Sequence, residues 1–165
     1  MSPAELCATL DQLGISYTKY EHDAVHTCEA ALAAVPDPTS VQTKNLFLRD
    51  KPGRKHYLLV TSCEKAVDIK KFAEKIDAGH LSFGSPERLQ KHLGLTPGSV
   101  TVFGLINDPE KTVELYIDAD VWARDKWNCH PLINTETLVV AKSDVEKFLK
   151  HTGHEAHIVK LESRE

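Results

Sequence analysis

The sequence lacks any apolar run long enough to cross a membrane. Its longest runs, such as residues 30–35 and 57–60, fall far short of the ~20 residues that a membrane-spanning helix needs. The chain does not open with a basic segment followed by an apolar one, so we expect no signal peptide and no membrane partner.

An excess of positive charge is also missing. The chain has 20 Lys and Arg against 24 Asp and Glu, a net charge of −4 with histidine neutral. No general positive field is therefore available to attract nucleic acid, and a nucleic-acid partner would require a local basic patch.

The four cysteines, Cys7, Cys28, Cys63 and Cys129, are scattered and form no Cys-x-x-Cys pair. This spacing argues against a zinc ribbon and against a thioredoxin-type site. We expect free thiols in a reducing cytosol, and hence a cytoplasmic protein. The nine histidines are dispersed as well, so we expect no bound metal.

Several common catalytic signatures are absent too. The chain has no Gly-rich phosphate loop, no His-Glu-x-x-His and no Gly-x-Ser-x-Gly, so neither a nucleotide cofactor nor those hydrolase types are indicated. Cys129 and His130 are adjacent, but neighbouring residues of a strand point to opposite faces, so they would not pair as nucleophile and base. We therefore expect no cofactor.

What is present is the composition of a globular domain. Of the 165 residues, 41% are hydrophobic and 27% are charged, as is typical of soluble proteins. No linker, repeat or low-complexity segment interrupts the chain, so we expect residues 1–165 to form a single domain.

Local signals predict helices interspersed with pairs of strands. Capping boxes at residues 2–5 and 143–146 predict two helix starts, and Gly94 is placed to end a helix. Because turns between strands outnumber strand–helix–strand units, we expect an α+β fold with a mixed, mostly antiparallel sheet and flanking helices. The predicted helices cover residues 2–14, 27–34, 68–76, 85–94 and 143–153, and the predicted strands cover residues 15–21, 44–49, 56–62, 99–106, 112–117, 138–141 and 157–159.

Three local segments carry features that suggest chemistry. Lys44 heads a largely apolar strand, residues 94–100 form a shaped loop with two glycines and a proline, and residues 130–137 place polar side chains between two strands. Each segment also has an ordinary interpretation, namely a solvated edge residue, a connector and a turn with side-chain caps.

Taken together and in order, the three segments resemble one family. The matching strings are Lys44-Asn45-Leu46-Phe47-Leu48, then Gly94-x-x-Pro97-Gly98-Ser99-Val100-Thr101-x-Phe103-Gly104-Leu105-x-Asn107-Asp108, then His130-Pro131-Leu132-x-Asn134-x-x-Thr137. Their order and spacing are similar to those of the YbaK / prolyl-tRNA synthetase-associated editing domain family, closest to its free-standing trans-editing members of the ProXp-ala type. One departure is Val102, where many members have proline.

The resemblance implies a partly closed mixed sheet and an enzyme that hydrolyses the ester between a wrong amino acid and the 3′-terminal adenosine of tRNA. The implied substrate is alanyl-tRNA(Pro). Clearance of Cys, Ser or Thr from tRNA is an alternative, and so is a non-catalytic module that binds tRNA or a synthetase. The implied partners are the acceptor end of proline tRNA and, beyond it, prolyl-tRNA synthetase or an elongation factor.

The resemblance also makes Lys44 an active-site residue, which either holds a phosphate or ribose oxygen or stabilises charge on the ester carbonyl. His130 is expected to bind the ribose or to assist proton transfer. Residues 94–99 are expected to offer backbone groups to the α-ammonium or to orient water. The implied catalytic set is Lys44, His130, Gly94, Pro97, Gly98 and Ser99.

Two further groups complete the expected site. An apolar wall and two amides would select the aminoacyl group, although the apolar members are equally compatible with plain core: Val25, Leu32, Val35, Phe47, Asn45 and Asn134. Basic residues of two predicted helices and the segment before them would contact tRNA, or would form only a solvated face: Lys65, Lys70, Lys71, Lys75, Arg88 and Lys91.

Overall fold

The computed structural model describes residues 1–164 and arranges their eight strands in one sheet. The strand order is β1-β7-β6-β2-β3-β5-β8, and β4 pairs with β2 off this path. The strands are β1 (Tyr17–Glu21), β2 (Val41–Asp50), β3 (His56–Ser62), β4 (Leu81–Phe83), β5 (Val113–Asp118), β6 (Lys126–Cys129), β7 (Glu136–Ala141) and β8 (Ala156–Val159).

The pairing pattern confirms a mixed, mostly antiparallel sheet. Four pairs are antiparallel, including β2 with β3 and β6 with β7, and three are parallel, including β2 with β6. The sheet is open, because β1 and β8 are the two ends of the strand order. The expectation of partial closure was therefore wrong. The expected domain limit at residue 165 lies outside the described residues.

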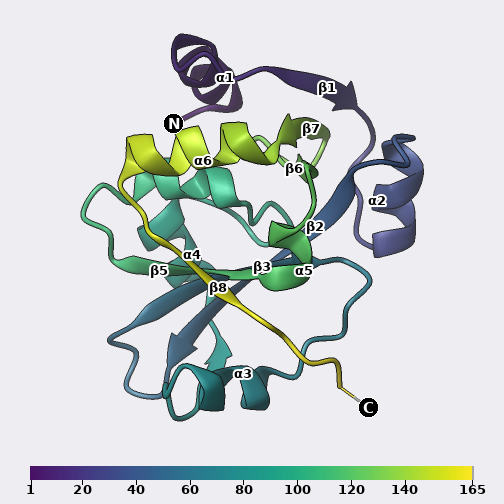
Figure 1. Cartoon of the computed structure of the whole chain (residues 1–165). Coiled ribbons are helices and arrows are strands. Elements are labelled where there is room, and N and C mark those ends of the chain that lie inside the picture. Colours follow the sequence, from purple (N-terminus) through teal and green to yellow (C-terminus); the bar gives the residue numbers. More distant parts are fainter. Residues whose placement is uncertain (165) are drawn as a thin grey trace.

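Helices cover both faces of the sheet. The helices are α1 (Pro3–Gln12), α2 (Cys28–Ala34), α3 (Ile69–Lys75), α4 (Pro86–Leu93), the 3₁₀ helix η1 (Val102–Asn107), α5 (Ala119–Trp122) and α6 (Lys142–Thr152). Buried residues of α1, α4, η1 and α6 share one core cluster with the sheet, whereas α3 packs into a second cluster with Leu161. In Figure 1, α3 accordingly lies at the opposite end of the molecule from α1 and α6.

Side-chain caps explain where several helices begin. Ser2 and Glu5 form the predicted capping box of α1, and Thr27 and Ser85 accept hydrogen bonds from backbone N–H groups at the starts of α2 and α4. Helix α4 ends at Gly94, whose φ of +65° lies in the left-handed region that glycine adopts at little cost. These predictions are confirmed.

Two local predictions failed. The box at residues 143–146 does not form, since α6 begins after Ala141, which provides no side-chain cap. Residues 99–106 are not a strand: Thr101 caps η1, and Phe103 and Leu105 are buried in the core. An apolar-rich stretch of this length fits a short helix as well as a buried strand, and packing against α4 and α6 decides between them here.

The cysteines also differ from expectation. Cys28 at the start of α2 and Cys63 just after β3 form a disulfide, so the prediction of four free thiols was wrong. Cys7 and Cys129 are free and buried. Within residues 1–164, no helix combines the length and hydrophobicity that crossing a membrane requires.

Candidate active site

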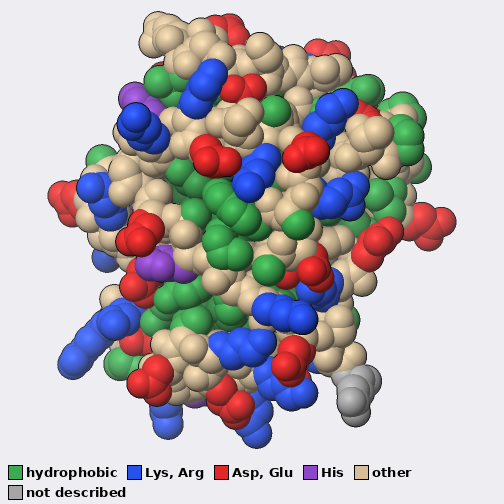
Figure 2. All heavy atoms as spheres, viewed as in Figure 1, with side chains coloured by type: hydrophobic (Ala, Val, Ile, Leu, Met, Phe, Trp, Pro, Cys, Tyr) green, Lys and Arg blue, Asp and Glu red, His purple; other side chains and the backbone are tan. Residues whose placement is uncertain are grey.

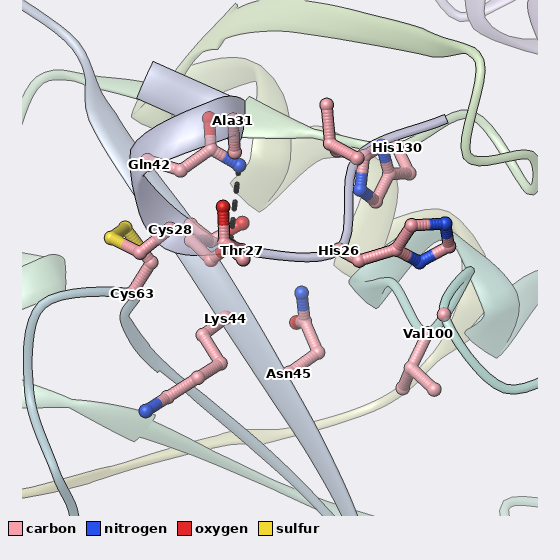
Figure 3. A pocket seen from close by; sticks show the side chains of 13 residues that line it. His26, Thr27, Cys28, Ala31, Gln42, Lys44, Asn45, Cys63, Val100 and His130 are labelled. Atoms are coloured by element: carbon pink, nitrogen blue, oxygen red, sulfur yellow. Dashed lines mark hydrogen bonds between the residues drawn. A yellow bond between two sulfur atoms is a disulfide. The ribbon is translucent and has the colours of Figure 1, made fainter. Parts of the chain in front are cut away.

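A cavity of about 240 Å³ opens between α2, β2 and the start of the loop after β6 (Figure 3). Its lining combines polar side chains of β2 with small and apolar groups of α2 and of the segment before it. The lining residues are Val25, His26, Thr27, Cys28, Ala31, Gln42, Thr43, Lys44, Asn45, Cys63, Gly98, Val100 and His130. Lys44, Asn45, Gly98, Val25 and His130, which were predicted from far-apart segments, therefore meet in one place.

The cavity lies along a gap in the pairing of β2. On the edge away from β3, β2 pairs with β6 through Val41 and Gln42 and with β4 from Leu48 onward. Within residues 1–164, no strand occupies this edge between those two pairings. Since Gln42 and Asp50 bond to the β3 side, the alternation of an antiparallel ladder turns the N–H and C=O of Asn45 toward the open edge.

Asn45 also presents its side chain to the cavity. In Figure 3 the amide extends into the space between His26 and Lys44. Among the described residues, its Oδ1 is one of the buried side-chain atoms that have no hydrogen-bond partner. That oxygen is shielded from the cavity, whereas Figure 3 shows the amide nitrogen at the tip of the side chain, so Asn45 offers a hydrogen-bond donor to a bound molecule.

His130 is held as a neutral hydrogen-bond acceptor. Its Nδ1 lies 3.0 Å from the Glu136 carbonyl oxygen, and because a carbonyl only accepts, Nδ1 must carry the proton. Burial lowers the pKa of His130, and nearby His22 lowers it further, against the opposing effect of the Glu136 hydrogen bond. The imidazole is therefore neutral at pH 7, and its Nε2 is available to accept a hydrogen bond.

Lys44 lines the cavity with its stem, but its ammonium is directed elsewhere. Nζ donates to the Lys65 carbonyl oxygen at 2.6 Å, and Figure 3 shows it extending away from His130. Burial lowers the pKa of Lys44, and the charge of Arg164 acts in the same direction. Lys44 thus borders the cavity through its methylenes and places its charge at the opposite face of β2 from Asn45.

The Gly-rich loop contributes less than expected. Gly98, with a φ of +90°, and Val100 line the cavity. Gly94, Pro97 and Ser99 are not among the lining residues: Gly94 ends α4, Pro97 is exposed and Ser99 is buried. Gly94 is structural, since a Cβ there would lie 2.9 Å from the Asn107 side chain.

The wall on the α2 side differs from the predicted one. Val25 and Ala31 line the cavity, whereas Leu32 is 40% exposed and borders a different hollow, and Val35 and Phe47 are core residues. Asn134 stays outside the lining and instead bonds both backbone groups of Val25, accepting from N–H at 3.4 Å and donating to C=O at 2.8 Å. Asn134 therefore positions the wall.

The predicted basic residues are largely engaged within the protein. Lys65 pairs with Asp118 and Asp120, both at 2.8 Å. Lys71 and Lys75 pair with Glu162 at 3.1 and 3.9 Å. Figure 2 shows blue and red side chains interleaved over the lower part of the molecule, where α3 lies in Figure 1, so this face carries no continuous basic patch.

Of the other predicted tRNA-binding residues, Arg88 is engaged within the protein, whereas Lys70 and Lys91 are exposed to solvent. Arg88 donates to the Gly53 carbonyl oxygen and contacts His56 Nε2, both at 3.0 Å.

Within residues 1–164, no three His, Cys, Asp or Glu side chains cluster as a metal site would require. Burial raises the pKa of the Cys129 thiol to about 12, so it stays protonated and is a poor nucleophile.

Solved structures with the same arrangement define a class of fold. A crystal structure described as a candidate trans-editing enzyme for prolyl tRNA synthetase superposes with a TM-score of 0.73 over 99% of both chains, at 18% identity. The crystal structure of the hypothetical protein APE2540 gives 0.72 at 16% identity, over 97% of this chain and 99% of that one. At such identities the likeness shows the fold alone.

Sequence comparison shows the family. The profile of the aminoacyl-tRNA editing domain matches residues 22–148, and the chain belongs to this family. It is 40% identical to the prolyl-tRNA editing protein ProX of Acetoanaerobium sticklandii over 154 residues. This alignment covers 93% of this chain and 94% of the relative. It is 30% identical to the prolyl-tRNA synthetase associated domain-containing protein 1 of Danio rerio, over 91% and 82% of the two chains.

Proposed function

We propose that this chain is a trans-editing aminoacyl-tRNA deacylase that removes alanine from proline tRNA. Family membership supports the class of reaction, and the 40% identical prolyl-tRNA editing protein supports the tRNA. The observation that carries the choice of alanine is that Val25 and Ala31 line the same cavity as Asn45 and His130.

Such an activity corrects errors that a synthetase cannot avoid by steric exclusion alone. A pocket built for proline cannot sterically exclude alanine, and each missing methylene gives only about 10- to 200-fold discrimination. A second site that accepts alanine and rejects proline corrects the error. If Val25 and Ala31 leave room beside the α-carbon for a methyl group only, the proline ring is overpacked there by about 1–3 kcal/mol, which corresponds to roughly 5- to 150-fold selectivity.

The polar groups around the cavity divide the work of ester hydrolysis. Water adds to the ester carbonyl carbon, the carbon–oxygen bond to the ribose breaks, and the ribose oxygen leaves with a proton. The backbone N–H of Asn45 at the open edge donates to the carbonyl oxygen as negative charge develops there. His130 Nε2 accepts the hydrogen bond of the neighbouring ribose hydroxyl and so orients the terminal adenosine.

The remaining contacts position the substrate. The backbone carbonyl of Gly98, which lines the cavity, accepts from the α-ammonium. The Lys44 ammonium, on the other face of β2, anchors the phosphate that precedes the terminal adenosine. Prolyl-tRNA synthetase or an elongation factor is the partner that would deliver this substrate, and the cytoplasm is the compartment in which it occurs.

Deacylation of purified tRNA(Pro) charged with alanine, serine, cysteine or proline tests the proposal. Alanyl-tRNA should be cleared fastest and prolyl-tRNA should survive, and His130→Ala should lose most of the activity. Preferred clearance of serine or cysteine would replace alanine as the substrate. Binding of tRNA without hydrolysis of any ester would favour the non-catalytic module.

A further inference from the structure

A second hollow, of about 460 Å³, lies on the other face of β2 and shares Lys44 with the first. Leu46, Val67 and Ile69 give it apolar walls, and Phe83 at the end of β4 stands at its side. Phe83 belongs to none of the three sequence motifs, and nothing in the ester chemistry uses it.

Phe83 is unusually exposed for its type. The residue is 60% exposed, more than Met1, Leu32 and Ile158, the other large hydrophobic residues that are exposed within residues 1–164. An aromatic face that is open to solvent beside an apolar hollow is the arrangement on which nucleobases stack, and such stacking is tolerant of base identity.

Positive charge lines the same hollow as this aromatic ring. Lys44, Lys70 and Arg164 border the hollow, against a single carboxylate from Asp68. That carboxylate is already engaged, because it accepts the Lys71 backbone N–H at the start of α3. The arrangement matches an aromatic base joined to a phosphodiester.

Backbone hydrogen bonds hold the C-terminal segment beside the hollow. The Arg164 backbone N–H donates to the Ala66 carbonyl oxygen at 2.7 Å, and Val67 pairs with Ser163 in an antiparallel bridge. Arg164 is close enough to Lys44 for its charge to lower the pKa of that ammonium. Two cations held near each other in this way favour an anion between them.

We propose that the hollow between Phe83, Lys70 and Arg164 binds the nucleotide that precedes the terminal adenosine in the single-stranded 3′ end of tRNA. The inference rests on the proposed function and extends it by one subsite. The strand passes over the open edge of β2 from the first cavity to the second, Lys44 holds the phosphate between them, and the preceding base stacks on Phe83.

The subsite predicts that a change at Phe83 affects hydrolysis of alanyl-tRNA but not of 3′-alanyl-adenosine. In Phe83→Ala, the KM for alanyl-tRNA should rise about 5- to 150-fold, the effect of losing one stacked base, with kcat nearly unchanged. Hydrolysis of 3′-alanyl-adenosine, which has no preceding nucleotide, should be unaffected. Phe83→Trp should restore the KM. Ile158→Ala, which removes an exposed apolar side chain on β8, is the matched control and should change neither substrate.

A binding measurement keeps the inference independent of catalysis. Uncharged tRNA is compared with the same tRNA lacking its last three nucleotides, on wild type, Phe83→Ala and Ile158→Ala. The expected result is that Phe83→Ala weakens only intact tRNA, and that Lys70→Ala reduces the slope of log affinity against log salt by about one.

The outcomes separate the two proposals. Hydrolysis of no ester, together with Phe83-dependent binding of intact tRNA, would overturn the proposed function and keep the subsite. Normal hydrolysis in Phe83→Ala with an unchanged KM, or equal weakening of intact and truncated tRNA, would overturn the subsite. Displacement of Phe83-dependent binding by an acidic peptide but not by the 3′ end of tRNA would assign the hollow to a protein partner, and would also overturn it.

Discussion

The sheet wall and the helix wall of the cavity are held in place by different means. On the sheet wall, Asn45 lies within the ladder between β2 and β3, and His130 is fixed through its Nδ1. On the helix wall, α2 has seven residues, of which only Ala31 is buried in the described structure, and a disulfide ties its first residue to Cys63. Figure 1 shows α2 at the right-hand edge of the molecule.

This difference indicates a division of labour. Groups that must be aimed at a reacting carbonyl need rigid support, which a paired strand provides. A wall that measures the size of a side chain needs only a suitable shape, and a short helix offers that shape through few residues. We infer that hydrolysis and size selection are separable properties of this cavity.

The largest expected effect is the loss of stability on reduction of the Cys28–Cys63 disulfide, which joins the helix wall to the end of β3. The disulfide spans a sequence separation of 35 residues, so reduction should lower the free energy of unfolding by about 4 kcal/mol in the chain-entropy description. Denaturant unfolding with and without a thiol reductant measures this change. The double variant Cys28→Ser/Cys63→Ser should be as unstable as the reduced protein and should not respond to reductant. A response in that variant would place the sensitive group elsewhere.

Loss of Lys44 should be the next largest effect. A charge-assisted contact to phosphate is worth about 1.5–3 kcal/mol, so Lys44→Ala should lower kcat/KM for alanyl-tRNA by roughly 10- to 150-fold. The change should fall mainly on KM, because the ammonium is directed away from His130. Lys51→Ala, at the exposed β2–β3 turn, is the control. A fall confined to kcat would show that Lys44 acts on the carbonyl instead.

The sheet wall also predicts a pH dependence. Burial holds the pKa of His130 below its ordinary value of 6.5, so the neutral acceptor dominates at pH 7 and is lost on acidification. The rate should be independent of this group above pH 6.5 and should fall about tenfold per unit below its pKa. His130→Gln should lack that inflection. A wild-type rate that rises on acidification would mean that the imidazolium is the active form.

Most features that depend on neighbouring residues were predictable from the sequence, the failed capping box at residues 143–146 being an exception. The caps at Ser2, Thr27 and Ser85 and the turn at residues 50–53 between β2 and β3 are set by local hydrogen bonding. Lys44 and His130 could be predicted as site residues only from the three motifs together, since each segment alone also fits an ordinary loop or strand end.

Features that depend on distant pairing were not predictable. The open edge of β2 exists because β6 and β4 stop short of each other along it. The Cys28–Cys63 bond joins elements whose proximity no spacing rule reveals. His26 and Gln42 line the cavity, but no sequence signal marks them.

Apolar patterns likewise gave the wrong neighbours for part of the predicted wall. Leu32 and Val35 lie on or beside a helix whose orientation only the tertiary structure fixes. Phe47 shares the β2 face of Asn45 but lies beyond the cavity lining, within the core. Periodicity identifies an apolar face, but it does not say whether that face meets a cavity or the core.

The most direct test of separable selection compares two variants of the helix wall, Val25→Ala inside the cavity and Leu32→Ala outside it. Each is assayed on tRNA(Pro) charged with alanine or with 2-aminobutyrate, which is one methylene larger. Val25→Ala should reduce the preference for alanine about tenfold with little change in the alanyl rate, and Leu32→Ala should leave the preference unchanged. An unchanged preference in Val25→Ala, or an equal shift in both variants, would contradict the account.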